Sequence, residues 1–161
     1  MKAIKPLEIH VASVHHVEGA GLEDEHVEHL GALGLIPVRA HEYYALQFML
    51  IHPWTEPTLP GQNEARVRFR LQSITDDDRL IGAQFAFSRV AELRSGIDNQ
   101  LPPVPWIDIR RGESMNFSPE GFHVLLKDLA QPLYRDRSYP LSLRFERSGT
   151  LTVMMSMSSA D

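Results

Sequence analysis

Histidine and methionine are the residue types in this chain that could bind a soft metal ion. The 161 residues include eight histidines, six methionines and no cysteine, so thiolate ligands and disulfides are excluded. Imidazole and thioether groups suit copper, and thioethers suit Cu(I) in particular. His123 lies in the apolar run "SPEGFHVLLKDLAQPL", Ser118 to Leu133. Taken alone, this position favours a hydrogen-bonded histidine in the core or at a strand edge over a metal ligand.

Three methionines lie close together in "VMMSMSS", near the end of the chain. Met155 and Met157 continue the apolar face of a predicted strand, and methionine is a common core filler. We therefore expect these two side chains in the core. Met154 points to the opposite face and is the better candidate for a functional role.

Residues 1–45 hold six of the eight histidines, together with seven acidic and three basic residues. His26 and His29 would share a face on a helix, and with His15 and His16 they could collect zinc or copper. A metal site needs three or four converging ligands, and this segment offers no evident scaffold for them. The pattern favours a solvated, His-rich N-terminal extension over residues 1–45, followed by a folded domain over residues 46–161.

The extension could contain a degenerate signal peptide. The apolar stretch "LGALGLIPV" ends at Val38, and Val38 and Ala40 stand where small residues precede a cleavage site. Its flank "LEDEHVEHL" is acidic, whereas a signal peptide carries Lys or Arg there. A cut between Ala40 and His41 would make His41 the first residue. No apolar run reaches the roughly 18–20 residues of a membrane span.

Other function classes have no positive sign in the sequence. The net charge of −5 does not suggest binding to nucleic acid or to an anionic membrane. Arg66, Arg68 and Arg70 form a basic stripe without interleaved aromatic residues, which favours a solvated strand face. There is no G-x-S-x-G nucleophile motif, no Gly-rich phosphate loop and no H-E-x-x-H. We therefore expect a protein that is not an enzyme.

The elements that must position these residues are strands. "ARVRFRLQS" alternates apolar and polar residues, which predicts a half-buried strand. "YPLSLRFERSGTLTVMMSM" predicts two strands joined by a turn at Ser148-Gly149, and "GFHVLLKDL" predicts another strand. "WIDIRRGESMNFSP" predicts a strand that ends at Gly112-Glu113. Many short strands separated by Pro- and Gly-rich turns indicate an all-β sandwich or Greek-key barrel.

Five blocks in sequence order resemble the PCu(A)C-type periplasmic copper chaperones. They cover residues 41–157 and read "HEYYALQFMLIHPWTEPTLPG", "DRLIGAQF", "AELRSG", "PVPWIDIRRGESMNFSPEGFHVLLKDLAQPL" and "YPLSLRFERSGTLTV". The resemblance implies an all-β fold, a cupredoxin-like or immunoglobulin-like Greek-key β-sandwich. It also implies copper as the ligand, the periplasm as the location, and copper-site assembly partners such as cytochrome oxidase subunits. The function we expect from the resemblance is therefore delivery of copper to such envelope enzymes, with a non-metal-binding interaction module as the alternative.

The family's ligands for Cu(I), two His and two Met, carry over poorly onto this sequence. The first His falls on Arg94, and its nearby Met falls on Gly96. The middle Met falls near Leu101. The second His is kept as His123, and the Met two residues further on is Leu125. A guanidinium cannot lose its proton to become a ligand.

Three interpretations remain open from the sequence. In the first, the copper site is lost and the fold serves as an interaction module. In the second, copper, as Cu(I) or Cu(II), is bound elsewhere: a processed His41 could chelate it through its α-amine and imidazole, completed by His52 or His123. In the third, the His-rich residues 1–45 stay attached and capture metal loosely.

Overall fold

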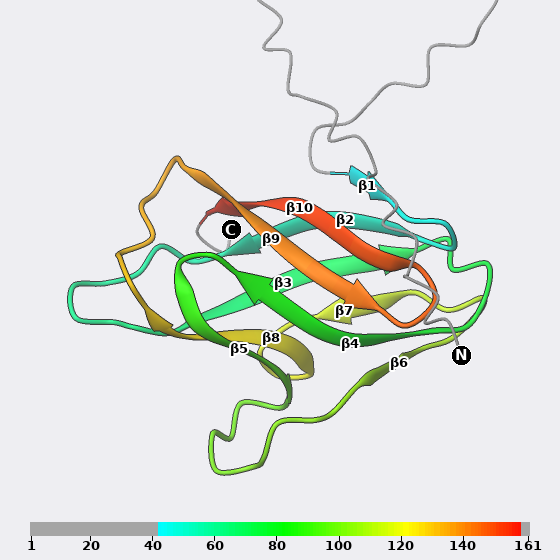
Figure 1. The fold of residues 1–161 in the computed structure, drawn as a ribbon, viewed down its shortest axis with the longest axis horizontal. Coiled ribbons are helices and arrows are strands. Elements are labelled where there is room, and N and C mark those ends of the chain that lie inside the picture. The colour runs from blue at the N-terminus through cyan, green and yellow to red at the C-terminus, as the bar shows by residue number, and fades with distance from the viewer. Residues whose placement is uncertain (1–41, 159–161) are drawn as a thin grey trace, which may run out of the picture.

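The computed structural model describes residues 42–158, which form ten β-strands and no helix (Figure 1). The strands are β1 (Glu42–Tyr44), β2 (Met49–Thr55), β3 (Ala65–Gln72), β4 (Asp78–Phe85), β5 (Ser88–Ser95), β6 (Ile107–Ile109), β7 (Met115–Phe117), β8 (Phe122–Leu129), β9 (Ser138–Phe145) and β10 (Gly149–Met157). The all-β prediction is confirmed. The described part of the chain has no helix that could span a membrane.

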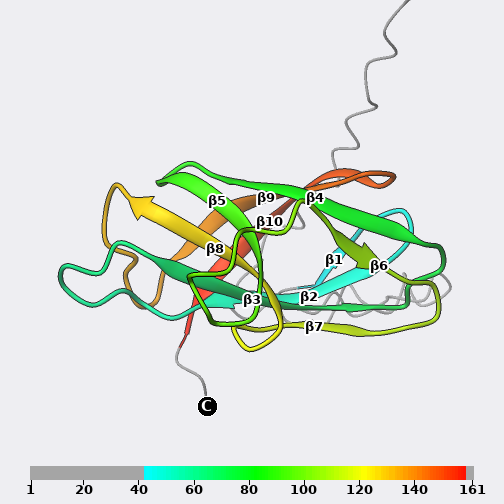
Figure 2. The same ribbon diagram turned by 90° about the horizontal axis from the view of Figure 1, so that it is seen from below.

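The strands form one continuous sheet in the order β5-β8-β3-β2-β10-β9-β4-β6, with β1 added to β2 and β7 added to β3. The pairing between β10 and β2 is parallel, and every other pairing in this part of the chain is antiparallel. The sheet bends into two layers, with β4, β5 and β9 above β2, β3 and β7 (Figure 2). This sandwich confirms the predicted class of fold.

Alternating apolar residues supply the core between the two layers. In β3, Val67, Phe69 and Leu71 are buried, as the period-two pattern predicts. Met155 and Met157 in β10 are also buried, which confirms their predicted place in the core. Met154 is only partly buried, and its backbone is bonded to the hydroxyl of Tyr43 in β1.

The segment around Gly112 differs from its prediction. We expected one strand ending at Gly112-Glu113, whereas β6 ends at Ile109 and β7 begins at Met115. Gly112 has a φ of 79° and donates its backbone N–H to Ile74. The turn at Gly112 joins β6 to β7. It thereby carries the chain from a strand that pairs with β4 to a strand that pairs with β3.

The predicted hairpin of β9 and β10 is confirmed, and a buried carboxylate holds its turn. Gly149 begins β10 with a φ of 73°, a conformation that glycine adopts without steric cost. Asp78, at the start of β4, accepts hydrogen bonds from the backbone N–H groups of Arg79, Arg147 and Ser148 and from the Ser148 hydroxyl. Asp78 therefore ties β4 to the turn.

Residues 1–41 lie outside the described residues, and so do the predictions that fall on them: the His-rich extension, the signal peptide and the role of His41. The division of the chain near residue 45 also stays a prediction. The first described strand, β1, pairs with β2 through Glu42 and Ile51.

Candidate functional site

Three neighbouring strands bring together the positions at which the resemblance expects copper ligands. In the register of β5 and β8, Arg94 lies opposite His123 and Glu92 lies opposite Leu125. On the other side of β8, Arg66 of β3 also pairs with Leu125. Paired residues, and residues two apart in a strand, lie on the same face of a sheet. These five side chains therefore share one face.

The loop between β5 and β6 lies against this face. The backbone N–H of Val104 donates to the carbonyl of Leu93, and that of Gly96 donates to Gly121 at the entry to β8. His123 and Leu125 are thereby almost fully buried although they do not face the main core. Leu101, the position of the middle Met, is in this loop.

His123 is completely buried, and both of its ring nitrogens have partners. A guanidinium nitrogen of Arg66, Nη1, lies 2.6 Å from Nε2 of His123. Because arginine can only donate, Nε2 must be the acceptor. Nδ1 then carries the proton and donates to the carbonyl of Gly121 at 3.2 Å. The hydrogen bonds thus assign a neutral imidazole whose free lone pair is already used.

The electrostatic surroundings keep His123 neutral. Burial is the largest effect on the pKa of His123 and lowers it. The hydrogen bond to the Gly121 carbonyl raises the pKa, whereas the positive charges of Arg66, Arg94 and Arg68 lower it further. The same charges act against any cation that approaches the ring.

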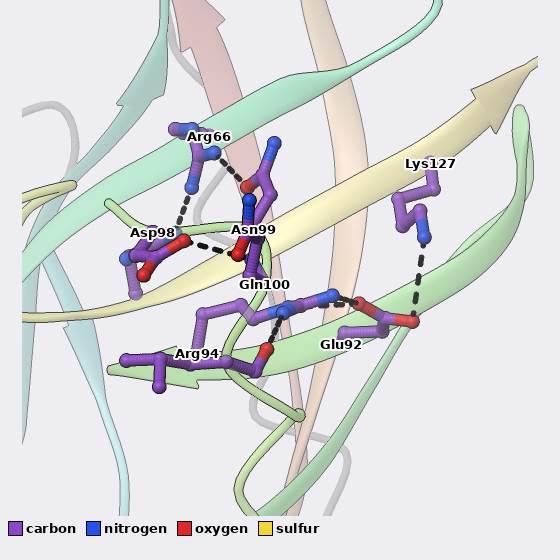
Figure 3. Close-up of polar contacts among 9 residues, drawn as sticks. Arg66, Glu92, Arg94, Asp98, Asn99, Gln100 and Lys127 are labelled. Atoms are coloured by element: carbon purple, nitrogen blue, oxygen red, sulfur yellow. Dashed lines mark hydrogen bonds and ion pairs between the residues drawn. The ribbon is translucent and has the colours of Figure 1, made fainter. Parts of the chain in front are cut away.

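Arg94 is 6% exposed and occupies the position of the family's first His. Its Nε and Nη2 donate to one oxygen of Glu92, at 2.9 and 2.5 Å, and its Nη1 donates to the carbonyl of Leu101 at 2.5 Å (Figure 3). The other oxygen of Glu92 lies 3.8 Å from the ammonium of Lys127. The single negative charge of Glu92 therefore compensates only one of the two positive charges beside it, those of Arg94 and Lys127.

Arg66 makes a second connection to the same loop. Its Nη2 donates to the side-chain carbonyl of Asn99 at 2.5 Å (Figure 3). Arg66 and Arg94 therefore hold the loop at two nearby residues, Asn99 and Leu101. We call Arg66, Glu92, Arg94, Asn99 and His123 the arginine cluster.

The residues of this face do not fit a copper ion. Leu101 and Leu125 carry no donor atom, Arg94 carries only protonated nitrogens, and the acceptor nitrogen of His123 is bonded to Arg66. Throughout residues 42–158, no group of three or more His, Asp or Glu side chains is placed to hold a metal ion. That His123 is a metal ligand therefore stays a prediction. The nitrogen with which His123 would bind the metal, Nε2, accepts a hydrogen bond from Arg66.

His52, the second predicted ligand among the described residues, lies apart from the arginine cluster. It is exposed in β2, and β3 lies between β2 and β8. Its φ is 50°, at a bulge where the pairing with β3 shifts between Ile51 and Trp54. The ring centroids of His52 and Trp54 are 6.2 Å apart, and the guanidinium of Arg68 lies over Trp54. His52 and His123 are not brought together.

Sequence reasoning did not find the partners of His123. Arg66 was predicted to be solvated, but it is only partly exposed and bonded to His123 and Asn99. The available signal was the pair Glu92 and Arg94 in "AELRSG", two apart and so on the same face of a strand. The loop that joins the cluster carried no comparable signal.

Comparison with solved structures identifies the class of the fold. The apo PCuAC domain from PmoF1 superposes with a TM-score of 0.68 at 18% identity, over 74% of this chain and 100% of that domain. The copper-bound PCuAC domain from PmoF2 gives 0.66 at 23% identity, over 75% and 100%. The Cu(I) form of DR1885 from Deinococcus radiodurans gives 0.57 at 19% identity, over 73% and 80%. The chain therefore has the fold of the PCuAC copper domains, and the resemblance indicated by the sequence is confirmed at this level.

Residues 48–157 match the family described as "Putative lipoprotein LpqE-like", and the chain belongs to this LpqE-like family. A comparison with curated protein sequences finds no match.

Proposed function

We propose that this chain is an interaction module of the cell envelope, built on the PCuAC fold, in which the arginine cluster has replaced copper. The observation that carries the proposal is the hydrogen bond from Arg66 to Nε2 of His123. A copper ion bound to that nitrogen would need the space and the lone pair that Arg66 now uses. The proposed role is binding without turnover of a substrate.

Charge and ligand chemistry support this proposal. Cu(I) prefers thioether and imidazole ligands. The face and its covering loop instead present two leucines, two guanidinium groups, one carboxylate paired with Arg94, and one imidazole whose acceptor nitrogen is occupied. The bonds from Arg94 to Leu101 and from Arg66 to Asn99 order the loop without a metal. The cluster thus supplies positive charge and cross-links where a metal ion would otherwise supply both.

The surface around the cluster offers a place for a partner protein. Ile97, Leu101 and Phe122 are exposed apolar residues, and the pairing of Ser95 with Phe122 places the loop and the start of β8 side by side. Exposed apolar residues that gather on one surface commonly mark an interaction site. The family's description as a lipoprotein supports an envelope location, although none of the 161 residues is a cysteine that could carry a lipid.

Copper delivery is the second candidate function. The copper-bound and Cu(I) forms of proteins with this fold favour it. In this candidate the chain would act in the periplasm and pass copper to envelope enzymes such as cytochrome oxidase. Because the His123 position is closed by Arg66, the copper would need other ligands, with His41 and His52 as the nominated residues.

Competition titrations with Cu(I) and Cu(II) chelators test whether the arginine cluster has replaced the metal. We expect His123→Ala to leave the copper affinity of the 161-residue chain unchanged. The matched control is Arg66→Ala, which frees Nε2 of His123 and should not reduce copper binding either. Stoichiometric copper that is lost in His123→Ala would overturn the proposal that the cluster has replaced the metal.

The partner is tested by site-specific photo-crosslinking in cells. A crosslinker at Leu101, beside the arginine cluster, should capture a discrete protein. The same crosslinker at Leu59, another exposed leucine, in the loop between β2 and β3, is the control. Equal capture at both positions, or capture at neither, would argue against a docking surface at the cluster.

A further inference from the structure

A second candidate site lies on the outer face of the sheet, where β9 runs between β10 and β4 (Figure 1). Residues of β9 alternate between the buried core and this outer face. Because directly paired residues share a face, the register of the three strands places six residues here in two rows. They are Gly82, Arg144 and Thr150 in one row, and Gln84, Ser142 and Thr152 in the next.

Gly82 opens a hollow in this face. The hollow has a volume of about 240 Å³, and its lining residues are small or polar apart from one arginine. They are Gly82, Ala83, Gln84, Ser142, Arg144 and Thr150. The φ of Gly82 is not positive, so its backbone does not require a glycine. A glycine inside a strand weakens the strand and often marks a close approach by a ligand or another backbone.

Arg144 carries the only charge in the two rows, and its guanidinium lies close to Gly82. A Cβ atom added to Gly82 would be 3.4 Å from Nη2 of Arg144 and 3.7 Å from Nε. Arg79, further along the same strands, pairs with Asp108 and Glu146. Arg144 makes no hydrogen bond or ion pair with another residue in the range 42–158. Its N–H donors therefore remain for water or for a ligand.

We propose that this hollow binds a small hydroxylated carboxylate, with sugar acids as the ligand class. The parallel N–H groups of a guanidinium match the two oxygens of a carboxylate, which makes Arg144 the anchor. Ser142, Thr150 and Gln84 offer hydroxyl and amide groups to the hydroxyls of the ligand. The hydroxyls of Ser142 and Thr152 lie 3.0 Å apart and are bonded to each other, which fixes the Ser142 hydroxyl beside the hollow.

The chemistry of the lining disfavours other small anions. A nucleotide base would need an aromatic side chain to stack on, and the described residues that line the hollow include none. The arginine cluster lies on β3, β5, β8 and the loop after β5, and none of its residues lines this hollow. The sugar-acid site therefore stands or fails independently of the proposed interaction module.

Titration of the full chain with sodium D-glucuronate, followed by ¹H–¹⁵N NMR, tests the site. The backbone amide of Gly82 and the Nε–H of Arg144 report from the hollow itself. We expect both signals to shift along a saturable curve at millimolar concentrations, because an exposed charge pair contributes little affinity. D-glucose lacks the carboxylate and acetate lacks the hydroxyls. At equal ionic strength, each should bind at least about fivefold more weakly, which corresponds to the loss of one hydrogen bond.

Variants of the two central residues test the geometry. Arg144→Gln should remove the saturable shift of the Gly82 amide, because the amide lacks the paired donors. A Cβ atom at Gly82 already reaches 3.4 Å from Arg144, so the larger side chain of Gly82→Val should fill the hollow and abolish the shift of the Arg144 Nε–H. Because strands favour valine, the urea midpoint of Gly82→Val should stay unchanged or rise. The control is Arg89→Gln, at an exposed arginine in β5, which should leave the titration unchanged.

Several results would overturn the proposal. They are no saturable shift of the Gly82 amide, an equal affinity for glucose or acetate, and an Arg144→Gln titration that matches the unsubstituted chain. An equal loss in Arg89→Gln and Arg144→Gln would also overturn it, because the signal would then report total charge. Galacturonate and its trimer distinguish two sources of the ligand, and both outcomes uphold the site: tighter binding of the trimer identifies a polysaccharide, and equal binding identifies the free acid.

Discussion

The ion pair between Arg94 and Glu92 gives the sharpest test of the arginine cluster. The two side chains are 8% and 17% exposed, and Arg94 also donates to the carbonyl of Leu101. Removing one partner of a buried pair costs about 3–5 kcal/mol, because the other charge is left uncompensated. Lys127, 3.8 Å from Glu92, remains as a partial partner. We therefore expect Arg94→Met, which keeps most of the stem, to lower the free energy of unfolding by about 3 kcal/mol.

The measurement is urea unfolding of the full chain, followed by circular dichroism and extrapolated linearly to water. A double-mutant cycle with Glu92→Gln isolates the pair, and we expect a coupling energy of at least about 1.5 kcal/mol. The control is the exposed pair of Arg79 and Asp108, at 3.0 Å with side chains 45% and 49% exposed. Asp108→Ala should cost less than about 1 kcal/mol. A coupling below about 0.5 kcal/mol for Arg94 and Glu92 would refute the reasoning, because that is the level of an exposed pair.

Three further predictions concern the turn, the histidine and the copper position. Asp78→Asn should lower the free energy of unfolding by roughly 3 kcal/mol in urea, because the amide turns an NH₂ group toward backbone N–H donors; a loss under roughly 1 kcal/mol would contradict this. Because the pKa of His123 lies below its ordinary value of 6.5, through burial and then the nearby arginines, its contribution to stability is complete above pH 6.5 and is lost as the pH falls. An NMR titration of the imidazole should show that lowered midpoint, and a midpoint at or above 6.5 would contradict it. The double substitution Arg94→His and Leu125→Met should raise the Cu(I) affinity at least about tenfold in chelator competition; an unchanged affinity would mean that this face cannot gather ligands.

The strands were predictable because their signal is local. In β3 the alternation of Val67, Phe69 and Leu71 with arginines fixes which face is buried, and no distant residue is needed to see it. The turn at Gly149 is equally local, since its positive φ favours glycine. The split of the Gly112 segment into β6 and β7 was missed because it depends on a bond to Ile74 and on pairing with two different strands.

The positions that make up the candidate site were also predictable, but the hydrogen bonds between their side chains were not. The sequence blocks placed Arg94, Leu101, His123 and Leu125 at the ligand positions, and the structure brings all four to one face and its covering loop. Nothing local indicated that Arg66, 57 residues away in the chain, would donate to His123. The basic stripe alone is compatible with a solvated face.

The sequence by itself determined the all-β class, the face that each strand buries, and the loss of donor atoms at Arg94 and Leu125. These follow from side-chain chemistry and a period of two, which are properties of neighbouring residues. Only the tertiary structure decided the protonation and the hydrogen-bond partner of His123. Both depend on which strands lie side by side, and strand order is set by packing over the whole sheet.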